Sequence, residues 1–344
     1  MKRVCSLLLT AVLLLSLCAC GGAALAPAPA PTAAPTAAPT EPPTPAPTPS
    51  PEELYAEAEA LLASGDFAAA EALFTSLGDY SDAADRVRDC RCRSALAQAR
   101  AGDMDGAREI LSELDDADSA ALLLKLETLD TRRALRDLEP GNTFFLGVYE
   151  QDNKPDTAPE PIEWLVIVDE GDRKLAVSLY CLESMRFHEE RGDVVWKDCS
   201  LRAWLNGDFF ENAFNEREKL LVPLREIDNS EDNGRKGTDS GDNTFDRVFL
   251  LSYHECVEAL VYTHAETIWD FQTTPTQRAK DGGAATGKFG GCWWWLRTAG
   301  KDARFIEYVD FNGIPWQTGF QATHEHGCVR PAIWLDLSDN ILDE

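Results

Sequence analysis

The chain has 344 residues, 44% of them hydrophobic, so it has room for two domains, at least one with a sizeable buried core. Its formal net charge at pH 7 is −27, and the acidic excess extends over both halves. Neither half therefore offers the positive surface that nucleic acid or an anionic lipid surface requires, and we exclude nucleic acid as a partner.

The first twenty residues have the pattern of a lipoprotein signal peptide. Lys2 and Arg3 precede an apolar run over 4–17 that is too short to span a bilayer, and the run closes on Leu-Cys-Ala-Cys at 17–20. We predict that residues 1–19 are removed and that Cys20 carries lipid such as palmitate. The protein would then be anchored on the extracytoplasmic face of the cell membrane. The alternative is an ordinary signal peptide that contains cysteines.

Residues 20–50 form a predicted linker. The stretch 27–50 consists of ten prolines, seven alanines, five threonines, one glutamate and one serine, which cannot build a core. Such a composition favours an extended, semi-rigid chain, so we expect a spacer between the lipid and the folded part.

Residues 51–138 are predicted to form an all-α domain of helical repeats. Gly65-Asp66 recurs as Gly102-Asp103, an offset of 37 residues. At this offset small residues replace small ones and large replace large, as expected for paired antiparallel helices; the matched pairs are Ala70 and Ala107, Phe74 and Leu111, Leu77 and Leu114, and Ala83 and Ala120. The segment "YAEAEALLASGDFAAAEALFTSLGDYSDA" resembles tetratricopeptide-type repeats. We expect a short stalk; the alternative is a peptide-binding groove.

Seven cysteines remain once the leader and the lipid site are set aside, and an odd number cannot all pair within one chain. Cys90 and Cys92 lie two residues apart in a predicted helix, where their side chains diverge, so we do not expect this pair to chelate a metal. Most cysteines are interpreted as small buried hydrophobic residues. The thiol or disulfide state is left open for Cys181, Cys199, Cys256, Cys292 and Cys328.

Residues 139–344 are predicted to form an α+β domain, because the apolar period changes from helical to alternating after Pro140. A strand is expected at "NTFFLGVYE", followed by a hairpin around Glu170-Gly171-Asp172. Helices are expected at "SLRAWLNGDFFENAF", with a break at Asn206-Gly207, and at "YHECVEAL", with a short buried strand at 247–252 between them. A closing antiparallel sheet is predicted from 291–297, 305–311, 313–319 and 329–337.

Five motifs in this order carry a resemblance to a known family: "PIEWLVI", "SLRAWLNGDFFENAF", "DRVFLLSYHE", "WWWLRTAG" and "GCVRPAIWL". Together they resemble a bacterial domain-of-unknown-function family, number 6273, over residues 139–338. The closing pattern in turn resembles the C-type-lectin-like fold of formylglycine-generating enzymes and of retroelement-diversified bacterial receptors. The resemblance implies a C-type-lectin-like fold. Thr298-Ala299 stands where the family usually has Ser-Pro, which puts the local turn in question.

Aromatic residues near the end of the chain are the first candidates for ligand binding. Residues 293–295 are three consecutive tryptophans on a predicted strand, so the middle ring faces away from the other two. One face belongs to the core, and the other is expected to join a platform for sugar rings or a protein partner. The alternative is that most of these rings simply belong to the hydrophobic core. The predicted ligand-binding residues are Trp294, Tyr308, Asp310, Asn312, Trp316 and Phe320.

Two arginines in apolar strands, Arg297 and Arg330, are predicted to reach into the interior. Each then requires a carboxylate or carbonyl groups. The alternative is a clamp for an anionic ligand.

Two segments carry candidate metal ligands. The loop 228–246 gathers oxygen donors that suit calcium, with Asp228, Asp232, Asp239 and Asp242 as candidates, although its glycine spacing departs from a calcium loop and a solvated loop is the alternative. His324 and His326 have a period of two that suits zinc if the strand bends at Gly327. The sequence does not identify a cofactor, and calcium is the candidate that we consider first.

No catalytic residues are predicted, because the chain has no Ser-His-Asp order, phosphate loop or His-Glu-x-x-His motif. We interpret the protein as a lipid-anchored binding protein that displays its C-terminal domain to an extracellular glycan, peptide or protein. The alternatives are an enzyme acting on envelope material and an interaction scaffold that works through the repeats. Cys292 beside Cys328, or His324 and His326 converging, would favour the enzyme.

Overall fold

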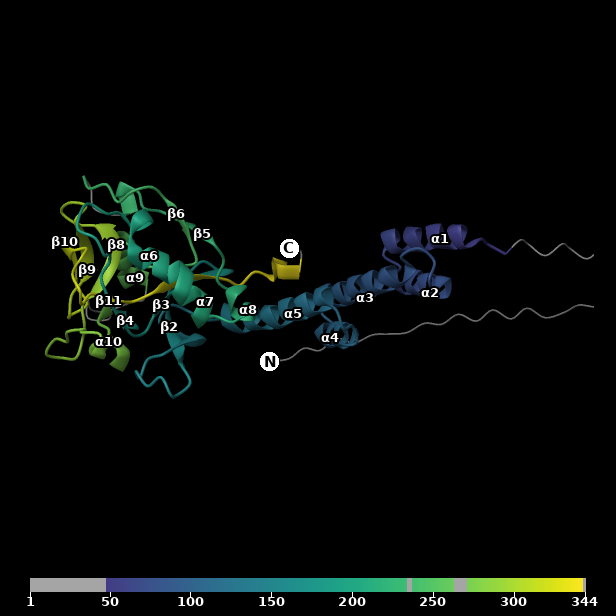
Figure 1. The fold of residues 1–344 in the computed structure, drawn as a ribbon, viewed down its shortest axis with the longest axis horizontal. Helices are drawn as coiled ribbons and strands as arrows, with labels where there is room; N and C mark the ends of the chain where they lie inside the picture. Colours follow the sequence, from purple (N-terminus) through teal and green to yellow (C-terminus); the bar gives the residue numbers. More distant parts are fainter. Residues whose placement is uncertain (1–47, 234–236, 263–270, 343–344) are drawn as a thin grey trace, which may run out of the picture. The chain divides into compact units, whose positions relative to one another are not determined.

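A computed structural model describes residues 48–233, 237–262 and 271–342. Residues 49–344 form one compact unit, in which five helices precede a mixed α+β part (Figure 1). The predicted signal peptide, the lipid site at Cys20 and nearly all of the linker lie outside the described residues. Within the described ranges, no helix is both long and apolar enough to cross a membrane.

The helical part repeats a helix–turn–helix pattern. Gly65 and Gly102 adopt the left-handed conformation that favours glycine, with φ of 88° and 94°, and the following Asp66 and Asp103 cap the next helix with their side chains. The five helices are α1 (Pro51–Ser64), α2 (Phe67–Leu77), α3 (Ala83–Arg100), α4 (Met104–Ser112) and α5 (Ala117–Arg136). The Gly-Asp repeat therefore marks two equivalent turns, as its spacing predicted.

The matched residues of the repeat occupy matched places for most of its length. Ala70, Ala107, Phe74 and Leu111 are all fully buried. The correspondence ends at Ala83 and Ala120, because Ala83 is buried whereas Ala120 is exposed. Cys90 and Cys92 pack into different apolar clusters on α3, which agrees with their predicted divergence.

Two five-stranded sheets and one two-stranded ribbon form the α+β part. The first sheet has the order β1-β2-β3-β12-β7, the second has the order β10-β9-β8-β11-β4, and β5 pairs with β6. The strands are β1 (Thr143–Tyr149), β2 (Glu160–Asp169), β3 (Arg173–Ser178), β4 (Glu183–Ser184), β5 (Arg225–Ile227), β6 (Thr244–Asp246), β7 (Val248–Phe249), β8 (Trp294–Ala299), β9 (Phe305–Val309), β10 (Pro315–Gln321), β11 (Cys328–Val329) and β12 (Ala332–Asp336).

Short helices join these strands. The segment expected to be a broken helix has its break where predicted, because a π-helical turn, η2 (Leu205–Phe209), separates α6 (Ser200–Trp204) from α7 (Phe210–Ala213). The other helical elements are η1 (Trp196–Asp198), α8 (Glu216–Lys219), η3 (Glu231–Asn233), α9 (Tyr253–Tyr262), α10 (Gln277–Asp281) and η5 (Asp339–Leu342). The expected combination of an all-α part and an α+β part is thus confirmed.

The predicted closing sheet is only partly correct. Strands β8, β9 and β10 are antiparallel neighbours, but the expected strand over 329–337 divides between the two sheets. Cys328 pairs in parallel with Trp294 in the second sheet, whereas Ala332 pairs with Val177 in the first. Pro331, which has no N–H to donate to a ladder, lies at the crossing point.

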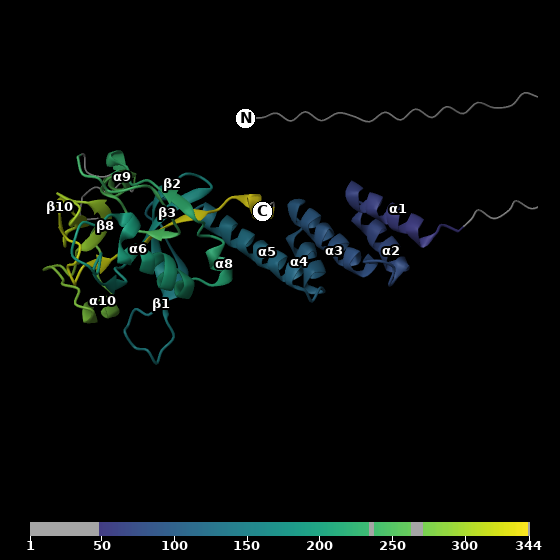
Figure 2. The same cartoon turned by 45° about the horizontal axis from the view of Figure 1, so that its top comes forward.

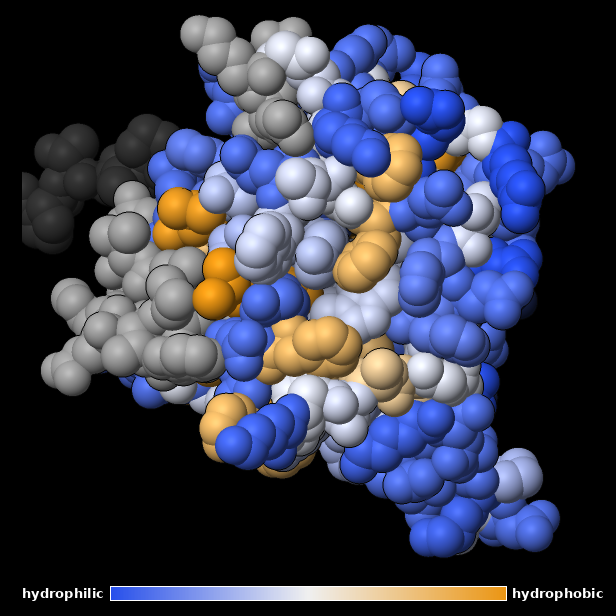
Figure 3. All heavy atoms as spheres, turned by 90° about the vertical axis from the view of Figure 1, so that its left-hand side faces the viewer, coloured by the Kyte–Doolittle hydropathy of each residue, from blue (hydrophilic) through white to orange (hydrophobic). Residues whose placement is uncertain are grey.

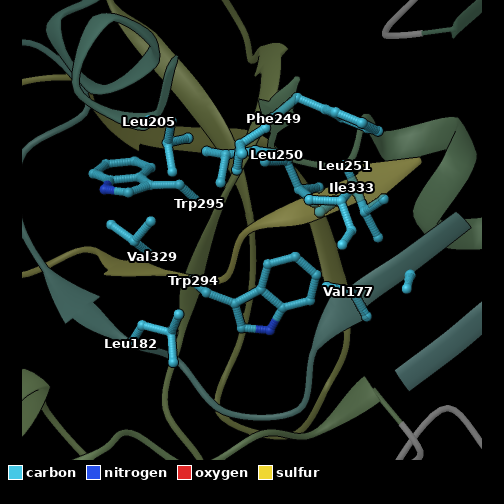
Figure 4. Close-up of a cluster of buried hydrophobic side chains, with 14 of the residues drawn as sticks. Val177, Leu182, Leu205, Phe249, Leu250, Leu251, Trp294, Trp295, Val329 and Ile333 are labelled. Atoms are coloured by element: carbon cyan, nitrogen blue, oxygen red, sulfur yellow. The ribbon is translucent and has the colours of Figure 1, made fainter. Parts of the chain in front are cut away.

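One large apolar core lies between these sheets and the helices that cover them. Figure 4 shows part of it, with Val177 of β3 and Ile333 of β12 near the ring of Trp294. The indoles of Trp294 and Trp295 point away from each other in this view, as expected for neighbours on a strand.

The last described element, η5 (Asp339–Leu342), packs against α5, and both ribbon views show the yellow C-terminal segment near this helix (Figures 1 and 2). Ile341 and Leu342 join the apolar cluster of Leu126 and Leu129. Arg132 of α5, 2% exposed, donates to the backbone carbonyl of Ser338 at 2.9 Å. The chain therefore returns after the α+β part to complete the apolar cluster of the helices.

Candidate functional site

The three consecutive tryptophans divide between two sides of the second sheet. Trp294 is fully buried in the core, so it has no surface to offer a ligand, and its expected place on the binding face is corrected. Trp293 and Trp295 lie on the opposite side, with ring centroids 4.8 Å apart. Phe187 covers Trp295, which is also fully buried, whereas Trp293 lies closer to the surface at 4% exposure.

A continuous group of rings extends from Trp293 toward solvent; we call Trp293, Tyr308, Phe320 and His324 the aromatic row. The ring centroid of Trp293 lies 5.7 Å from Tyr308, 4.7 Å from Phe320 and 5.2 Å from His324. The last three side chains are half-buried. Burial and the neighbouring His326 lower the pKa of His324, so this imidazole is neutral at pH 7 and presents a weakly polar ring face.

Trp316 is the exposed continuation of this face. It lies directly across the β9–β10 ladder from Tyr308 and is 46% exposed. Its indole Nε1 donates to Oδ2 of Asp310 at 3.1 Å, while Oδ1 of Asp310 accepts from the backbone N–H groups of Asn312 and Ile314. The Asp310 carboxylate therefore orients the indole and closes the turn.

A polar cavity of about 590 Å³ adjoins the aromatic row at the other end of the hairpin. Gln321 and Ala322, which follow Phe320, belong to its lining, and so does Phe305 at the start of β9. The same wall contributes three cations, Arg191, Lys301 and Arg304, in a chain with a net charge of −27. Asp302 partly balances them by accepting from Arg304 at 3.0 Å.

Figure 3 views the end of the α+β part that carries β9 and β10. Hydrophobic and weakly polar residues gather in the middle of this face, and hydrophilic residues border them on the right. A partly apolar centre with a polar rim is the usual anatomy of a recognition surface.

Among the described residues of the acidic loop, the four candidate calcium ligands do not lie together. No group of three or more metal-ligand atoms within 4.8 Å of one another, among the described residues, includes Asp228, Asp232, Asp239 or Asp242. Asp242 instead pairs with Lys197 at 2.7 Å, and Asp239 accepts from the N–H of Gly241.

The same loop holds the buried Arg297. The Asp228 carbonyl and the Asn229 side chain each accept from this guanidinium at 2.9 Å, and Glu255 forms an ion pair with it. Arg330 is also buried and donates to the carbonyls of Ser178 and Phe271. Both arginines therefore reach the interior and find the partners predicted for them.

The two histidines do not converge on a metal. His324 and His326 have ring centroids 6.1 Å apart, and Nδ1 of His324 accepts from the backbone N–H of His326. No group of potential ligand atoms in the described ranges contains either residue.

A group of three cysteines lies inside the domain; we call Cys181, Cys292 and Cys328 the thiol cluster. Sequence reasoning considered Cys292 beside Cys328 but did not place Cys181 with them. All three are fully buried, and their sulfur atoms lie within 4.8 Å of one another. Hydrogen bonds from Cys181 and Cys328 lower the pKa of the Cys292 thiol to about 5, whereas burial raises the pKa of Cys181. The three cysteines are far apart in sequence, so only the strand topology brings them together.

A second group of potential ligands, Glu150, Asp152 and Glu160, lies near the surface. These carboxylates already accept hydrogen bonds from backbone N–H groups: Glu150 and Asp152 from Lys154, and Glu160 from Gln151. They therefore serve to close the loop after β1.

Comparison with known families supports the predicted family over part of the expected range, since the match begins at residue 171 and leaves the motif "PIEWLVI" outside it. Residues 171–337 match the family model described as "Domain of unknown function (DUF6273)". The family resemblance is therefore confirmed over this segment, which contains the hairpin face, the cationic cavity wall and the thiol cluster. No curated protein and no solved structure matches the chain.

Proposed function

We propose that this protein is a lipid-anchored extracytoplasmic binding protein that recognises a carbohydrate through the β9–β10 hairpin. The observation that carries this proposal is Trp316, which is exposed yet held in one orientation by Asp310 beside the aromatic row. Sugar rings stack their C–H faces on aromatic side chains. An indole that is already ordered loses little conformational entropy when it binds.

The cationic cavity narrows the ligand class. Arg191, Lys301 and Arg304 favour a negatively charged group, and arginine suits the planar geometry of a carboxylate or the oxygens of a phosphate. A glycan with a uronic acid or a phosphate substituent would place its sugar ring on the aromatic row and its charge in the cavity.

The rest of the chain supports display of this face. The leader and Cys20 would supply the lipid anchor, the Pro-rich linker the spacer, and α1–α5 a tetratricopeptide-like stalk. The C-type-lectin-like fold belongs to this proposal on the strength of the motif resemblance alone.

The enzyme alternative depended on Cys292 lying beside Cys328, and this pair is present. Both thiols are fully buried, however, so an external substrate does not reach them in this conformation. The position of the pair therefore argues for a role inside the domain.

The test is binding of purified residues 49–344 to arrays of neutral, uronic-acid-containing and phosphorylated oligosaccharides. Trp316→Ala should weaken binding about tenfold, since an aromatic contact is worth up to about 1.5 kcal/mol. Arg304→Gln should weaken binding of the acidic glycans alone. Phe245→Ala, at an aromatic side chain that is 59% exposed in β6, is the matched control.

Two results would contradict the glycan proposal: no saturable binding to any oligosaccharide, or binding that Trp316→Ala leaves unchanged. Binding that a truncated chain retains without residues 139–344 would favour the scaffold alternative. We expect a calcium chelator to change nothing, because the loop carboxylates do not converge.

A further inference from the structure

We propose that the thiol cluster of Cys181, Cys292 and Cys328 binds one thiophilic closed-shell metal ion, Zn²⁺ or Cu⁺, as an internal structural site. This role is separate from the hairpin face and does not depend on it. Thiolates are the preferred ligands of both ions, and three of them in one place form a recognisable donor set.

The spacing of the sulfur atoms fits a metal. Three sulfurs around one ion at about 2.3 Å lie roughly 4 Å from one another. The sulfur atoms of the thiol cluster already lie within 4.8 Å of one another, so a small contraction completes the site. A disulfide needs about 2.05 Å between two sulfurs and would leave the third thiol without a role.

Backbone hydrogen bonds fix two of the cysteines on one strip of chain. The N–H of Cys292 donates to the carbonyl of Thr273 at 2.9 Å, and the N–H of Cys181 donates to that of Thr274 at 3.1 Å. Cys181 also accepts from the N–H of Thr276 at 3.0 Å. These ligands are therefore positioned by the fold before any ion arrives.

The third cysteine, Cys328, lies on a strand of the second sheet. Cys328 pairs with Ser184 of β4 on one side and with Trp294 of β8 on the other. An ion at the cluster would therefore connect the middle of the second sheet to the 273–276 strip.

The surroundings favour a negatively charged cluster. Arg330 is 1% exposed, and its charge acts on the thiols of Cys181 and Cys292. Its guanidinium donates to backbone carbonyls, and no ion pair with a carboxylate is found for it among the described residues. Formally, three thiolates are neutralised by one Zn²⁺ together with this one cation, while Cu⁺ would leave a single negative charge. A buried arginine without a counter-charge is otherwise costly.

The indole of Trp294 is a second buried group without a partner, and it lies on the same side of the sheet as the side chain of Cys328. The indole Nε1 of Trp294 has no hydrogen-bond partner although the residue is fully buried. Because Trp294 is the ladder partner of Cys328, the two side chains project from the same face.

Burial of all three ligands indicates a structural site rather than a catalytic one. Binding would release up to three protons as the thiols become thiolates, and no electrons are transferred. Since the sulfurs have no solvent exposure, the ion would enter while the domain folds and leave when it unfolds.

The experiment uses residues 49–344 refolded without oxygen in the presence of Zn²⁺ alone or Cu⁺ alone, followed by gel filtration and elemental analysis. We expect one equivalent of ion per chain. Preference for Zn²⁺ or for Cu⁺ distinguishes the two ions. Co²⁺ in place of Zn²⁺ should give thiolate-to-metal charge-transfer absorption in the near ultraviolet.

Single serine substitutions at Cys181, Cys292 and Cys328 should each lower the affinity for the metal ion by at least about tenfold. Loss of a residue that only hydrogen-bonds to a metal ligand already costs about tenfold, and loss of the ligand itself should cost more. Cys199→Ser is the matched control. Cys199 is also buried, but its sulfur only accepts the helix-capping N–H of Arg202, a role that serine fills.

A second measurement uses the wild-type protein and therefore tests the proposal even if these variants fail to fold. The wild-type protein is unfolded and alkylated under non-reducing conditions, and the labelled cysteines are mapped by mass spectrometry. Three alkylated cluster cysteines together with one bound ion support the proposal. A disulfide between any two of them, or refolded protein that carries no ion, overturns it.

Discussion

The guanidinium of Arg297 and the carboxylate of Glu255 form a two-pronged ion pair beneath the acidic loop. Nη2 of Arg297 lies 2.7 Å from Oε1 of Glu255, and Nη1 contacts Oε2. The arginine side chain is fully buried and the glutamate is 21% exposed. The loop that resembled a calcium site therefore covers a charge pair that belongs to the protein itself.

Stability should depend on this pair in a pH-dependent manner. Burial alone would raise the pKa of Glu255, but the neighbouring Arg297 outweighs it and lowers the pKa below the ordinary value of 4.5. A lowered pKa in the folded state stabilises the protein above pH 4.5, and this contribution is lost as the pH falls through the folded-state pKa.

We expect Glu255→Gln to lower the free energy of unfolding by about 3 kcal/mol at pH 7, because it leaves a buried guanidinium without its counter-charge. The difference from wild type should shrink as the pH falls below 4.5. Urea unfolding of both proteins between about pH 3 and 7 measures this difference in the free energy of unfolding. Glu258→Gln, on the exposed side of the same helix, should change little; an equal effect of both variants would contradict the role of the pair.

Gly327 is expected to tolerate no side chain. A Cβ atom at this position would overlap the indole of Trp295, whose Nε1 is held by the carbonyl of Met185 at 3.0 Å. We expect Gly327→Ala to destabilise the domain by about 2 kcal/mol, within the range for overpacked cores.

The control for this prediction is Gly207→Ala. A Cβ there meets no atom within 4 Å and the residue lies in the π-helical turn, so the substitution should be neutral or slightly stabilising. Thermal unfolding of both variants compares them. Equal melting temperatures would show that the indole of Trp295 moves aside.

Asp310 is predicted to act on ligand binding through Trp316. Asp310→Ala should release the indole N–H and two turn N–H groups, lower stability by about 1 kcal/mol and weaken glycan binding several-fold. Asp310→Asn keeps one acceptor oxygen, which can close the turn, but its NH2 group cannot accept from the indole, so this variant should keep most of the stability and still weaken binding. Hydrogen exchange of the Trp316 indole N–H, followed by NMR, should be faster in both variants than in the wild type; unchanged exchange would exclude the orienting role.

The local patterns that sequence reasoning used were sufficient for most elements. The Gly-Asp repeat predicted two helix–turn–helix units, and the Asn206-Gly207 break corresponds to the π-helical turn. Alternation also predicted that Trp294 opposes Trp293 and Trp295. It could not tell which side was core, because both sides of β8 are covered by apolar side chains.

A single sequence could not predict which distant segments of the chain contact each other. Cys181, Cys292 and Cys328 each adjoin a short strand, and each alone has the composition of an ordinary core position. Their convergence depends on the parallel pairing of β11 with β8, which periodicity does not indicate. In the same way, nothing local indicates that residues 339–342 join the core of the helices.

The contact of residues 339–342 with the helices leads to a prediction about the cooperativity of unfolding. Arg132 of α5 donates to the carbonyls of Ser338 and Leu220 and forms an ion pair with Asp336 at 3.2 Å. Arg132→Ala would remove a nearly buried donor and leave these acceptors without it. We expect a loss of about 3 kcal/mol in the free energy of unfolding.

Two probes can report the two parts separately during urea unfolding. All nine tryptophans lie between Trp164 and Trp334, so tryptophan fluorescence follows the α+β part, while far-ultraviolet circular dichroism is dominated by α1–α5. The two transitions should coincide in the wild type and separate in Arg132→Ala. Arg133→Ala, whose side chain is 43% exposed, should leave them coincident. Separate transitions in the wild type would instead mean that the helices fold independently, because the shared core at 339–342 would then contribute no coupling.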